Sequence, residues 1–376
     1  MRKYYLDNIR YFTIINVVLF HVIYMYNGQS IPGVIGPFYK GQIQDLFQYI
    51  VYPWIMVLLF IISGMSSKYY LNKYDKSSYI HDRTVKLLVP STIGLLVFGW
   101  AQGYYNMLLS EVFLKLPSNM NKLLLFLIMC ISGTGVLWFN QVLWINSIIL
   151  VLILKFEKNK ILNFCENINF MILLSLGCGL YFSAQILNTP IIVAYRFGIY
   201  GFAFLLGYFV FSHEKNIKHL EYNYKFLICM SITLGILFSY KYYGENYASK
   251  EIFGSPLSVS YSWFTCLSIL GIGKLFFDKE YKFTKYMKEK SYGIYIFHYL
   301  FLSSTAYYLK KYCNAFPLIH YLLVGCSSFI GSILLFEIIS KIPFINWCIL
   351  GISNNKNKNK KKYLKINNNL FILIMY

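Results

Sequence analysis

Long apolar stretches recur along the whole chain and are separated by short polar loops. A helix needs about 20 apolar residues to cross the bilayer core, allowing for tilt. The pattern predicts ten membrane-spanning helices, at residues 11–27, 47–65, 87–109, 136–154, 168–187, 195–211, 225–243, 257–277, 292–309 and 318–341. Another apolar run, 123–131, is too short to span, and predicts either a re-entrant segment or an extension of the fourth helix across Gly133 and Gly135. The expected fold class is therefore an all-α, polytopic membrane protein.

The composition is that of a membrane protein. Of 376 residues, 57% are hydrophobic and only 13% are charged, whereas an average soluble protein is about a quarter charged. Because the apolar runs leave no room for a large soluble domain, residues 1–345 are expected to form one membrane domain. Residues 346–376 form an Asn/Lys-rich tail that cannot bury a core. This tail is expected to be disordered, or to rest its lysines on anionic lipid head groups.

Positive charge is distributed unevenly between the two sets of loops. If successive spans alternate in direction, 27 of the 35 Lys and Arg residues fall on the side of the N-terminus. Cytoplasmic loops carry such an excess, so both termini are predicted to lie in the cytoplasm and the protein in the cell (plasma or inner) membrane. A net charge of +20 would suggest nucleic acid as a partner of a soluble protein. Here the charge is spread over several loops and a tail, which favours membrane lipid and excludes nucleic acid.

The first predicted helix carries two basic residues at a regular spacing. Arg10 precedes the apolar run, and His21 lies eleven residues later, inside it. Eleven residues advance a helix by about 16 Å and about three turns, so the two side chains lie on nearly the same face. If Arg10 lies at a membrane surface, His21 lies near the midplane, where an ionisable group is costly and is usually functional.

Each of these residues has a chemical and a structural interpretation. A buried neutral imidazole can take a proton from a hydroxyl as a general base, or it can simply bond to a neighbouring helix. The second interpretation is favoured for His298, the other histidine inside an apolar span. Arg10 can bind phosphate through two parallel hydrogen bonds, or it can anchor the helix while paired with Asp7. A ligand with phosphates at one end and a reactive group about 16 Å away would fit the spacing, and acyl-coenzyme A is such a molecule.

Several short motifs occur in a defined order within residues 4–341. They are Tyr5-Leu6-Asp7-Asn8-Ile9-Arg10 with Phe20-His21, Phe60-Ile61-Ile62-Ser63-Gly64, Arg83-Thr84-Val85-Lys86-Leu87-Leu88-Val89-Pro90, Leu137-Trp138-Phe139, the stretch 201–207, and Ser291-Tyr292-Gly293-Ile294-Tyr295-Ile296-Phe297-His298. The ordered set resembles the integral-membrane acyltransferase 3 family. That family includes O-antigen, peptidoglycan and periplasmic-glucan acyltransferases and the nodulation-factor acetyltransferase, and has ten spans.

The resemblance implies roles for individual residues. The histidine that closes the first motif, His21, is the implied catalytic base, and Arg10 is the implied contact for acyl-CoA. The family's second basic motif, Arg-x-x-Arg, stands here as Arg83-Thr84-Val85-Lys86. Lys86 still attracts phosphate, but as a point charge instead of a two-pronged donor.

Further candidates have a weaker basis. The family can use an acidic residue near the outer end of the third helix, for which Glu111 is the nearest candidate; a solvated loop carboxylate is the alternative. Asp7, Trp138, Tyr292 and His298 are candidates for supporting or acceptor-side residues. For the aromatic residues, packing in the core or at the membrane interface is the alternative.

The resemblance therefore implies a membrane O-acyltransferase that moves an acyl group, expected to be acetyl, from acyl-CoA to a hydroxyl of a cell-surface or exported carbohydrate. Acyl-CoA is the donor substrate, and neither a metal nor a bound cofactor is expected. Two alternatives stay open. One is a multi-span permease that carries an acyl group or small solute without transfer chemistry. The other is an inactive scaffold, against which the intact Arg10 and His21 pair argues.

Overall fold

The computed structural model describes residues 3–29, 33–189, 194–313 and 315–352. Within these ranges the chain is helical and forms no β-strand. The α-helices are α1 (Tyr4–Tyr24), α2 (Leu46–Leu71), α3 (Lys76–Arg83), α4 (Trp100–Leu109), α5 (Val112–Lys115), α6 (Lys122–Ser132), α7 (Trp138–Phe156), α8 (Lys160–Cys165), α9 (Phe170–Gln185), α10 (Phe197–Phe209), α11 (Glu214–Tyr222), α12 (Tyr224–Tyr242), α13 (Lys250–Phe253), α14 (Pro256–Phe276), α15 (Lys282–Tyr312), α16 (Pro317–Ile339) and α17 (Pro343–Leu350). Shorter turns are the 3-10 helices η1 (Ile43–Asp45) and η4 (Gly135–Leu137) and the π-helices η2 (Thr84–Leu88) and η3 (Leu95–Gly99).

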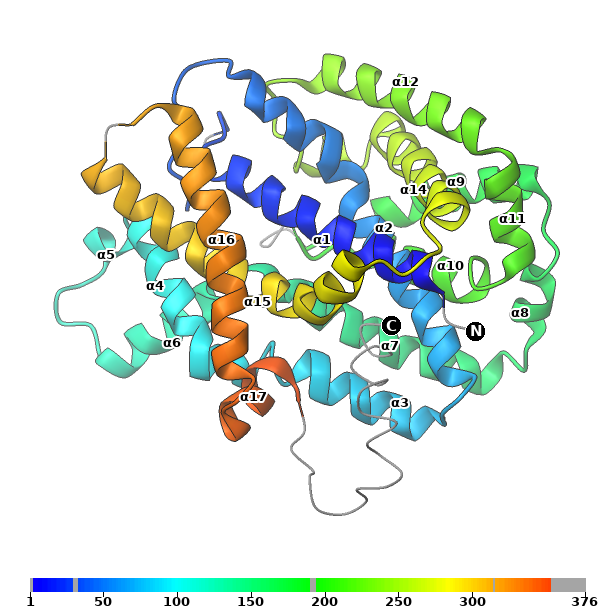
Figure 1. Ribbon diagram of the computed structural model, residues 1–376, viewed down its shortest axis with the longest axis horizontal. Coiled ribbons are helices and arrows are strands. Elements are labelled where there is room, and N and C mark those ends of the chain that lie inside the picture. The colour runs from blue at the N-terminus through cyan, green and yellow to red at the C-terminus, as the bar shows by residue number, and fades with distance from the viewer. Residues whose placement is uncertain (1–2, 30–32, 190–193, 314, 353–376) are drawn as a thin grey trace.

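Helix α1 runs through the middle of the molecule and contacts α2, α14, α15 and α16 (Figure 1). Its apolar residues divide between two hydrophobic clusters. Leu6 and Phe20 pack in a cluster shared with α2, α10 and α14, whereas Ile14, Val18 and Val22 pack in a second cluster with α15, α16 and α17. Because α1 belongs to both clusters, its side chains are held from several sides.

Helices α2 and α10 approach so closely that both need glycine at the contact. A Cβ added to Gly64 would lie 2.0 Å from the carbonyl oxygen of Phe204, and one added to Gly207 would lie 2.0 Å from that of Ile61. Small residues allow helix backbones in membranes to pack at short range. This contact fixes the position of α2, which carries two serines of the candidate site.

All ten predicted spans are helical over most of their length, but six helical stretches among the described residues are long and apolar enough to cross a membrane. These stretches are Tyr4–Tyr24, Ile43–Leu71, Gly135–Phe156, Tyr224–Tyr242, Pro256–Phe276 and Pro317–Ile339. Helices α9 and α10 are apolar but shorter. The protein is thus an all-helical, multi-pass membrane protein. The count of ten spans and the cytoplasmic position of both termini stay predictions.

Outward-facing helices expose apolar side chains, as lipid-facing helices do. Ile236 of α12 is 63% exposed and Leu322 of α16 is 57% exposed. Monomeric soluble proteins rarely expose apolar surface in continuous patches, so these faces are best explained by contact with lipid.

The third predicted span is not one continuous helix. It consists of η2, a turn at residues 89–92, two helical residues at 93–94, η3 and α4. Pro90 has no backbone N–H, so the carbonyl of Lys86, four residues earlier, lacks its helical donor. The hydroxyl of Tyr292 in α15 donates to this carbonyl at 2.7 Å. A distant helix therefore supplies the hydrogen bond that the proline removes.

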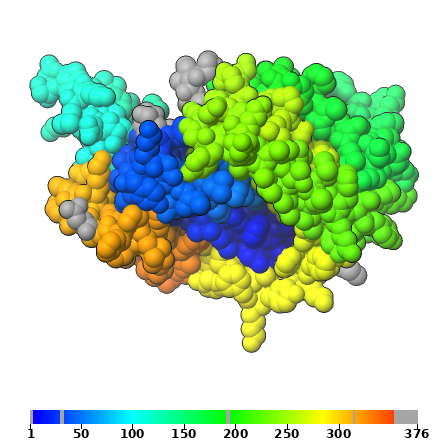
Figure 2. Space-filling view, turned by 90° about the horizontal axis from the view of Figure 1, so that it is seen from above, coloured from blue at the N-terminus to red at the C-terminus, as the bar shows by residue number. Residues whose placement is uncertain are grey.

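The short apolar run 123–131 forms a separate helix, α6, which packs against α4. The backbones meet at Gly103, where an added Cβ would lie 1.7 Å from the carbonyl oxygen of Met129. Gly135 has a φ of 40° and separates α6 from α7. The run is therefore not an extension of the fourth span. Figure 2 shows α5 and α6, in cyan, projecting from the body of the molecule.

The packed part of the chain continues past residue 345, where the sequence placed the start of the tail. Helix α17 buries Cys348 and Leu350, and Gly351 ends it with a φ of 63°. A Cβ at Gly351 would lie 2.4 Å from the carbonyl oxygen of Val85, so α17 lies against the segment that carries Lys86. The remainder of the predicted tail, 353–376, lies outside the described residues.

The α2–α10 contact predicts an effect on stability. We expect Gly64→Ala and Gly207→Ala each to lower the free energy of unfolding by about 1–3 kcal/mol, because the new methyl group meets backbone atoms. Thermal unfolding of the protein in detergent measures this effect. Gly325→Ala in α16 is the control, because nothing lies within 4 Å of its added Cβ. Equal unfolding temperatures for the three variants would contradict the close contact.

Candidate active site

Arg10 and His21 lie in one continuous helix, α1, as the sequence predicts. Their separation along the helix axis is therefore about 16 Å. Arg10 is near the N-terminal end of α1, and His21 is in its last turn. The surroundings of the two residues differ.

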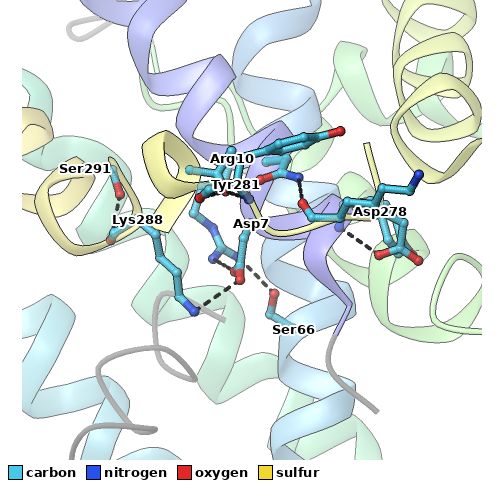
Figure 3. Close-up of polar contacts among 11 residues, drawn as sticks. Asp7, Arg10, Ser66, Asp278, Tyr281, Lys288 and Ser291 are labelled. Carbon is cyan, nitrogen blue, oxygen red and sulfur yellow. Dashed lines mark hydrogen bonds and ion pairs between the residues drawn. The ribbon is translucent and has the colours of Figure 1, made fainter. Parts of the chain in front are cut away.

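Arg10 is buried among polar groups from three helices. Its guanidinium donates to the hydroxyl of Ser66 in α2 at 3.0 Å and lies 3.7 Å from the carboxylate of Asp7. The ammonium group of Lys288 in α15 lies 3.3 Å from the same carboxylate. Figure 3 shows Asp7 between Arg10 and Lys288. This buried carboxylate offsets part of the charge of both cations and restrains the Arg10 side chain.

Two adjacent serines of α2 each bind one arginine. Ser66 accepts from Arg10 at 3.0 Å, and Ser67 accepts from Arg83 at 2.9 Å. Ser67 also accepts from the hydroxyl of Tyr79 at 2.9 Å. Each serine donates its own proton to the carbonyl four residues earlier in α2. A hydroxyl has one donor and two acceptor positions, so Ser67 uses all three.

Arg83 is held on a second side by an aromatic ring. Its guanidinium carbon lies 5.1 Å from the centre of the Tyr79 ring, one helical turn earlier in α3. Such a cation–π contact contributes about 0.5–1 kcal/mol or more when it is shielded from water. The side chain of Arg83 is therefore oriented before any ligand binds.

Lys86 lies in the π-helical turn η2, just before the third predicted span. Burial lowers the pKa of Lys86 to about 8; Arg83 acts in the same direction, and Asp82 opposes it. A short π-helical stretch is often found at a functional site. Here it follows Arg83 directly and places Lys86 in the wall of the same cavity.

One cavity brings the three cationic residues together. Its wall includes Arg10 from α1, Arg83 from α3 and Lys86 from η2. The rest of the wall is mainly apolar and aromatic, formed by Ile14, Leu59, Ser63, Leu87, Phe139, Asn140, Leu143, Tyr292, Tyr295 and Leu350. Three cations beside an apolar surface suit a ligand with phosphate groups at one end and an apolar part at the other.

His21 does not line this cavity and pairs instead with His298 of α15. Nδ1 of His21 lies 3.1 Å from Nε2 of His298. His298 is fully buried, whereas His21 is partly exposed. Nδ1 of His298 lies 2.9 Å from the carbonyl oxygen of Tyr295. Since Tyr295 lines the cavity, the histidine pair adjoins it.

The other predicted site residues divide into two groups. Tyr292 lines the cavity, and Asp7 contacts the cavity residue Arg10 without belonging to the wall. Trp138 packs against Tyr200, with ring centres 5.4 Å apart, and is not in the cavity wall. Glu111 is exposed at the start of α5, with a φ of 55°. The structure therefore does not bring Trp138 or Glu111 to the cavity, and their roles stay predictions.

Sequence reasoning did not single out Ser66, Ser67 or Lys288. A signal for the serines was available, because Ser66 and Ser67 stand three and four residues after Ser63, at the end of the second predicted span. That spacing places them on one helical face. Lys288 has no such signal, because it is one of six lysines between residues 274 and 290. Only the packing of α15 against α1 distinguishes it.

The fold and the site define a multi-pass membrane protein with a cation-lined cavity beside a pair of histidines. The family model for the acyltransferase domain of the acyltransferase 3 type matches residues 3–337. The chain therefore belongs to this acyltransferase family. Helix α17, which supplies Leu350 to the cavity wall, lies beyond the matched range. Comparison with curated proteins and with solved structures gives no match.

The lowered pKa of Lys86 predicts unusual reactivity. The amine reacts with acylating reagents only when it is neutral, so we expect labelling of Lys86 to rise with a midpoint near pH 8. Peptide mass spectrometry after brief treatment with a small acylating reagent measures the labelled fraction. Lys86→Arg, which removes the amine, is the control for peak assignment. Labelling that rises only near the ordinary lysine value of 10.5 would contradict burial of this amine.

Proposed function

We propose that the protein is a membrane O-acyltransferase that transfers an acyl group, acetyl in the simplest case, from acyl-CoA to a hydroxyl of a cell-surface or exported carbohydrate. Membership of the acyltransferase family supports the reaction class. The choice of donor rests on one observation, the cavity that gathers Arg10, Arg83 and Lys86.

The cavity suits the phosphate-bearing part of acyl-CoA. Arginine binds phosphate in a fork and lysine binds it as a point charge, so these side chains can hold the phosphates of the donor. The wall continues along α1 to Ile14 and along α15 to Tyr295. From Ile14 to His21 the helix rises by about 10 Å. In this proposal the thioester arm extends along α1 from the cavity toward His21.

The transfer itself needs one base and a positioned thioester. His21 takes the proton of the acceptor hydroxyl as this oxygen attacks the thioester carbonyl carbon. A C–O bond forms and the C–S bond breaks. His21 then gives the proton to the departing thiolate, so CoA leaves as the thiol. Proton transfer by a positioned base contributes typically 10²–10⁴-fold, and orienting the two reactants supplies the rest of the rate gain.

The uneven loop charges support a direction for the reaction. With the N-terminal side in the cytoplasm, Arg10 lies nearer the cytoplasmic end of α1 than His21 does. Acyl-CoA then enters from the cytoplasm, where it is made, and the carbohydrate reaches His21 from the opposite side. The membrane domain thus brings together two substrates from different compartments.

Replacement of His21 tests the catalytic role. We expect His21→Ala to lower acetyl transfer by about 10²–10⁴-fold. The measurement is transfer from labelled acetyl-CoA to envelope carbohydrate by purified protein in vesicles, with folding checked by gel filtration. His219→Ala is a matched control, because His219 lies in α11, away from the cavity wall. Full activity of His21→Ala would contradict the assignment.

Removal of either arginine tests the phosphate site. We expect Arg10→Ala and Arg83→Ala each to weaken acetyl-CoA binding about tenfold or more, because a hydrogen bond to a charged group contributes about 1.5–3 kcal/mol. Arg10→Lys and Arg83→Lys, which keep the charge, should lose less.

Calorimetric titration with acetyl-CoA measures these affinities. Lys73→Ala is the control, because it removes an exposed cation close to the end of α2 and outside the cavity wall. An equal loss in Lys73→Ala would show that only general charge matters. Binding of acetyl-CoA without any transfer to a carbohydrate would favour the permease alternative.

A further inference from the structure

The hydrogen bonds of His298 define which of its nitrogens carries the proton. Nδ1 lies 3.0 Å from the carbonyl oxygen of Ile294 and 2.9 Å from that of Tyr295. Carbonyl oxygens only accept, so Nδ1 must be the N–H. His298 is fully buried, and burial disfavours a second proton on the ring. Its Nε2 therefore presents a lone pair.

That lone pair faces His21. Nε2 of His298 and Nδ1 of His21 are 3.1 Å apart, and an acceptor at this distance requires an N–H on His21. This contact therefore places the proton of His21 on Nδ1.

We propose that His298 is a positioning residue that holds His21 in the Nδ1–H tautomer and leaves the Nε2 of His21 as the base. This inference rests on the proposed function, in which His21 takes the acceptor proton. Both hydrogen bonds therefore have the same direction. Nδ1 of His298 donates to the backbone, and Nδ1 of His21 donates to Nε2 of His298. His298 thus orients His21 as the carboxylate of a catalytic triad orients its histidine, and it does so without adding a negative charge to the membrane interior.

The geometry also explains why an apolar residue does not suffice at position 298. Without an acceptor at the place of Nε2, His21 can hold its proton on either nitrogen and can rotate about its side-chain bonds. A proton on Nε2 of His21 removes the lone pair that the acceptor hydroxyl needs. The wrong tautomer of a catalytic histidine can cost about 10⁴-fold in turnover.

Two amide substitutions separate positioning from packing. The glutamine side chain places its amide near the Nε2 position of a histidine, whereas asparagine reaches only the Nδ1 position. We expect His298→Gln to keep kcat within about tenfold of the unmodified protein. His298→Asn and His298→Leu should lower kcat by about 10²–10⁴-fold. The KM for acetyl-CoA should change little in all three, because its phosphates bind at Arg10 and Arg83.

Nitrogen NMR of ¹⁵N-histidine-labelled protein reads the tautomer directly and does not depend on activity. The signals of His21 are assigned by their loss in His21→Gln. We expect Nδ1–H for His21 in the unmodified protein and in His298→Gln, and a mixture or Nε2–H in His298→Leu. Protein without transferase activity but with this tautomer pattern would refute the proposed function and leave the His298 contact intact.

Other results would overturn the inference itself. Nε2–H at His21 in the unmodified protein would do so, as would full turnover by His298→Leu. Equal losses of turnover in His298→Gln and His298→Leu, with an unchanged His21 tautomer in both, would assign His298 to packing only. Gel filtration and thermal unfolding of each variant show which proteins are folded well enough to compare.

Discussion

The need to hold cationic side chains inside a helix bundle governs the structure of the site. A charge removed from water costs several kcal/mol unless hydrogen bonds or an opposite charge compensate it. Ser66, Ser67 and the carboxylate of Asp7 provide this compensation for Arg10 and Arg83. The serines can do so only because α2 lies where Gly64 and Gly207 allow it to pack against α10. Tight packing of apolar helices thus determines the positions of the guanidinium groups of Arg10 and Arg83.

A second constraint comes from a proline. Pro90 interrupts the third predicted span, and the uncompensated carbonyl of Lys86 accepts the hydroxyl of Tyr292. The same α15 carries Lys288 beside Asp7 and His298 beside His21. Helix α15 therefore connects the cationic end of the site to its proposed chemical end. A shift of α15 would change both ends together, which makes this helix the structural link between the proposed donor site and the proposed base.

Much of the fold could be predicted from hydrophobic periodicity. The apolar runs are mainly helical because a helix makes its backbone hydrogen bonds within its own segment, which lipid cannot provide. Periodicity could not show that the third run is interrupted at Pro90, because the break is stabilised from a distant part of the chain. The hydroxyl of Tyr292 donates to the Lys86 carbonyl that the proline leaves without a donor. Periodicity also could not assign the run 123–131, whose separation from α7 depends on the positive φ of Gly135. Helix α17 was missed because its packing against Val85 depends on a glycine contact far away in sequence.

The candidate site could be predicted only where its residues are close together in the sequence. Arg10 and His21 stand on one helix, so their spacing could be read from the sequence alone. Arg83 and Lys86 could be named from their motif, but only folding shows that they share a cavity with Arg10. The pairing of His21 with His298 joins residues 277 positions apart. No local pattern encodes such a contact, which is why packing was the favoured interpretation of His298.

A structure of the protein with bound acetyl-CoA in lipid tests the central claim most directly. The account predicts that the phosphates of the donor contact Arg10, Arg83 and Lys86. It also predicts that the acetyl carbonyl carbon lies along α1 on the side of His21, with Nε2 of His21 open to the acceptor. Acetyl-CoA bound away from these three residues, or with its acetyl group pointing away from His21, would contradict the account.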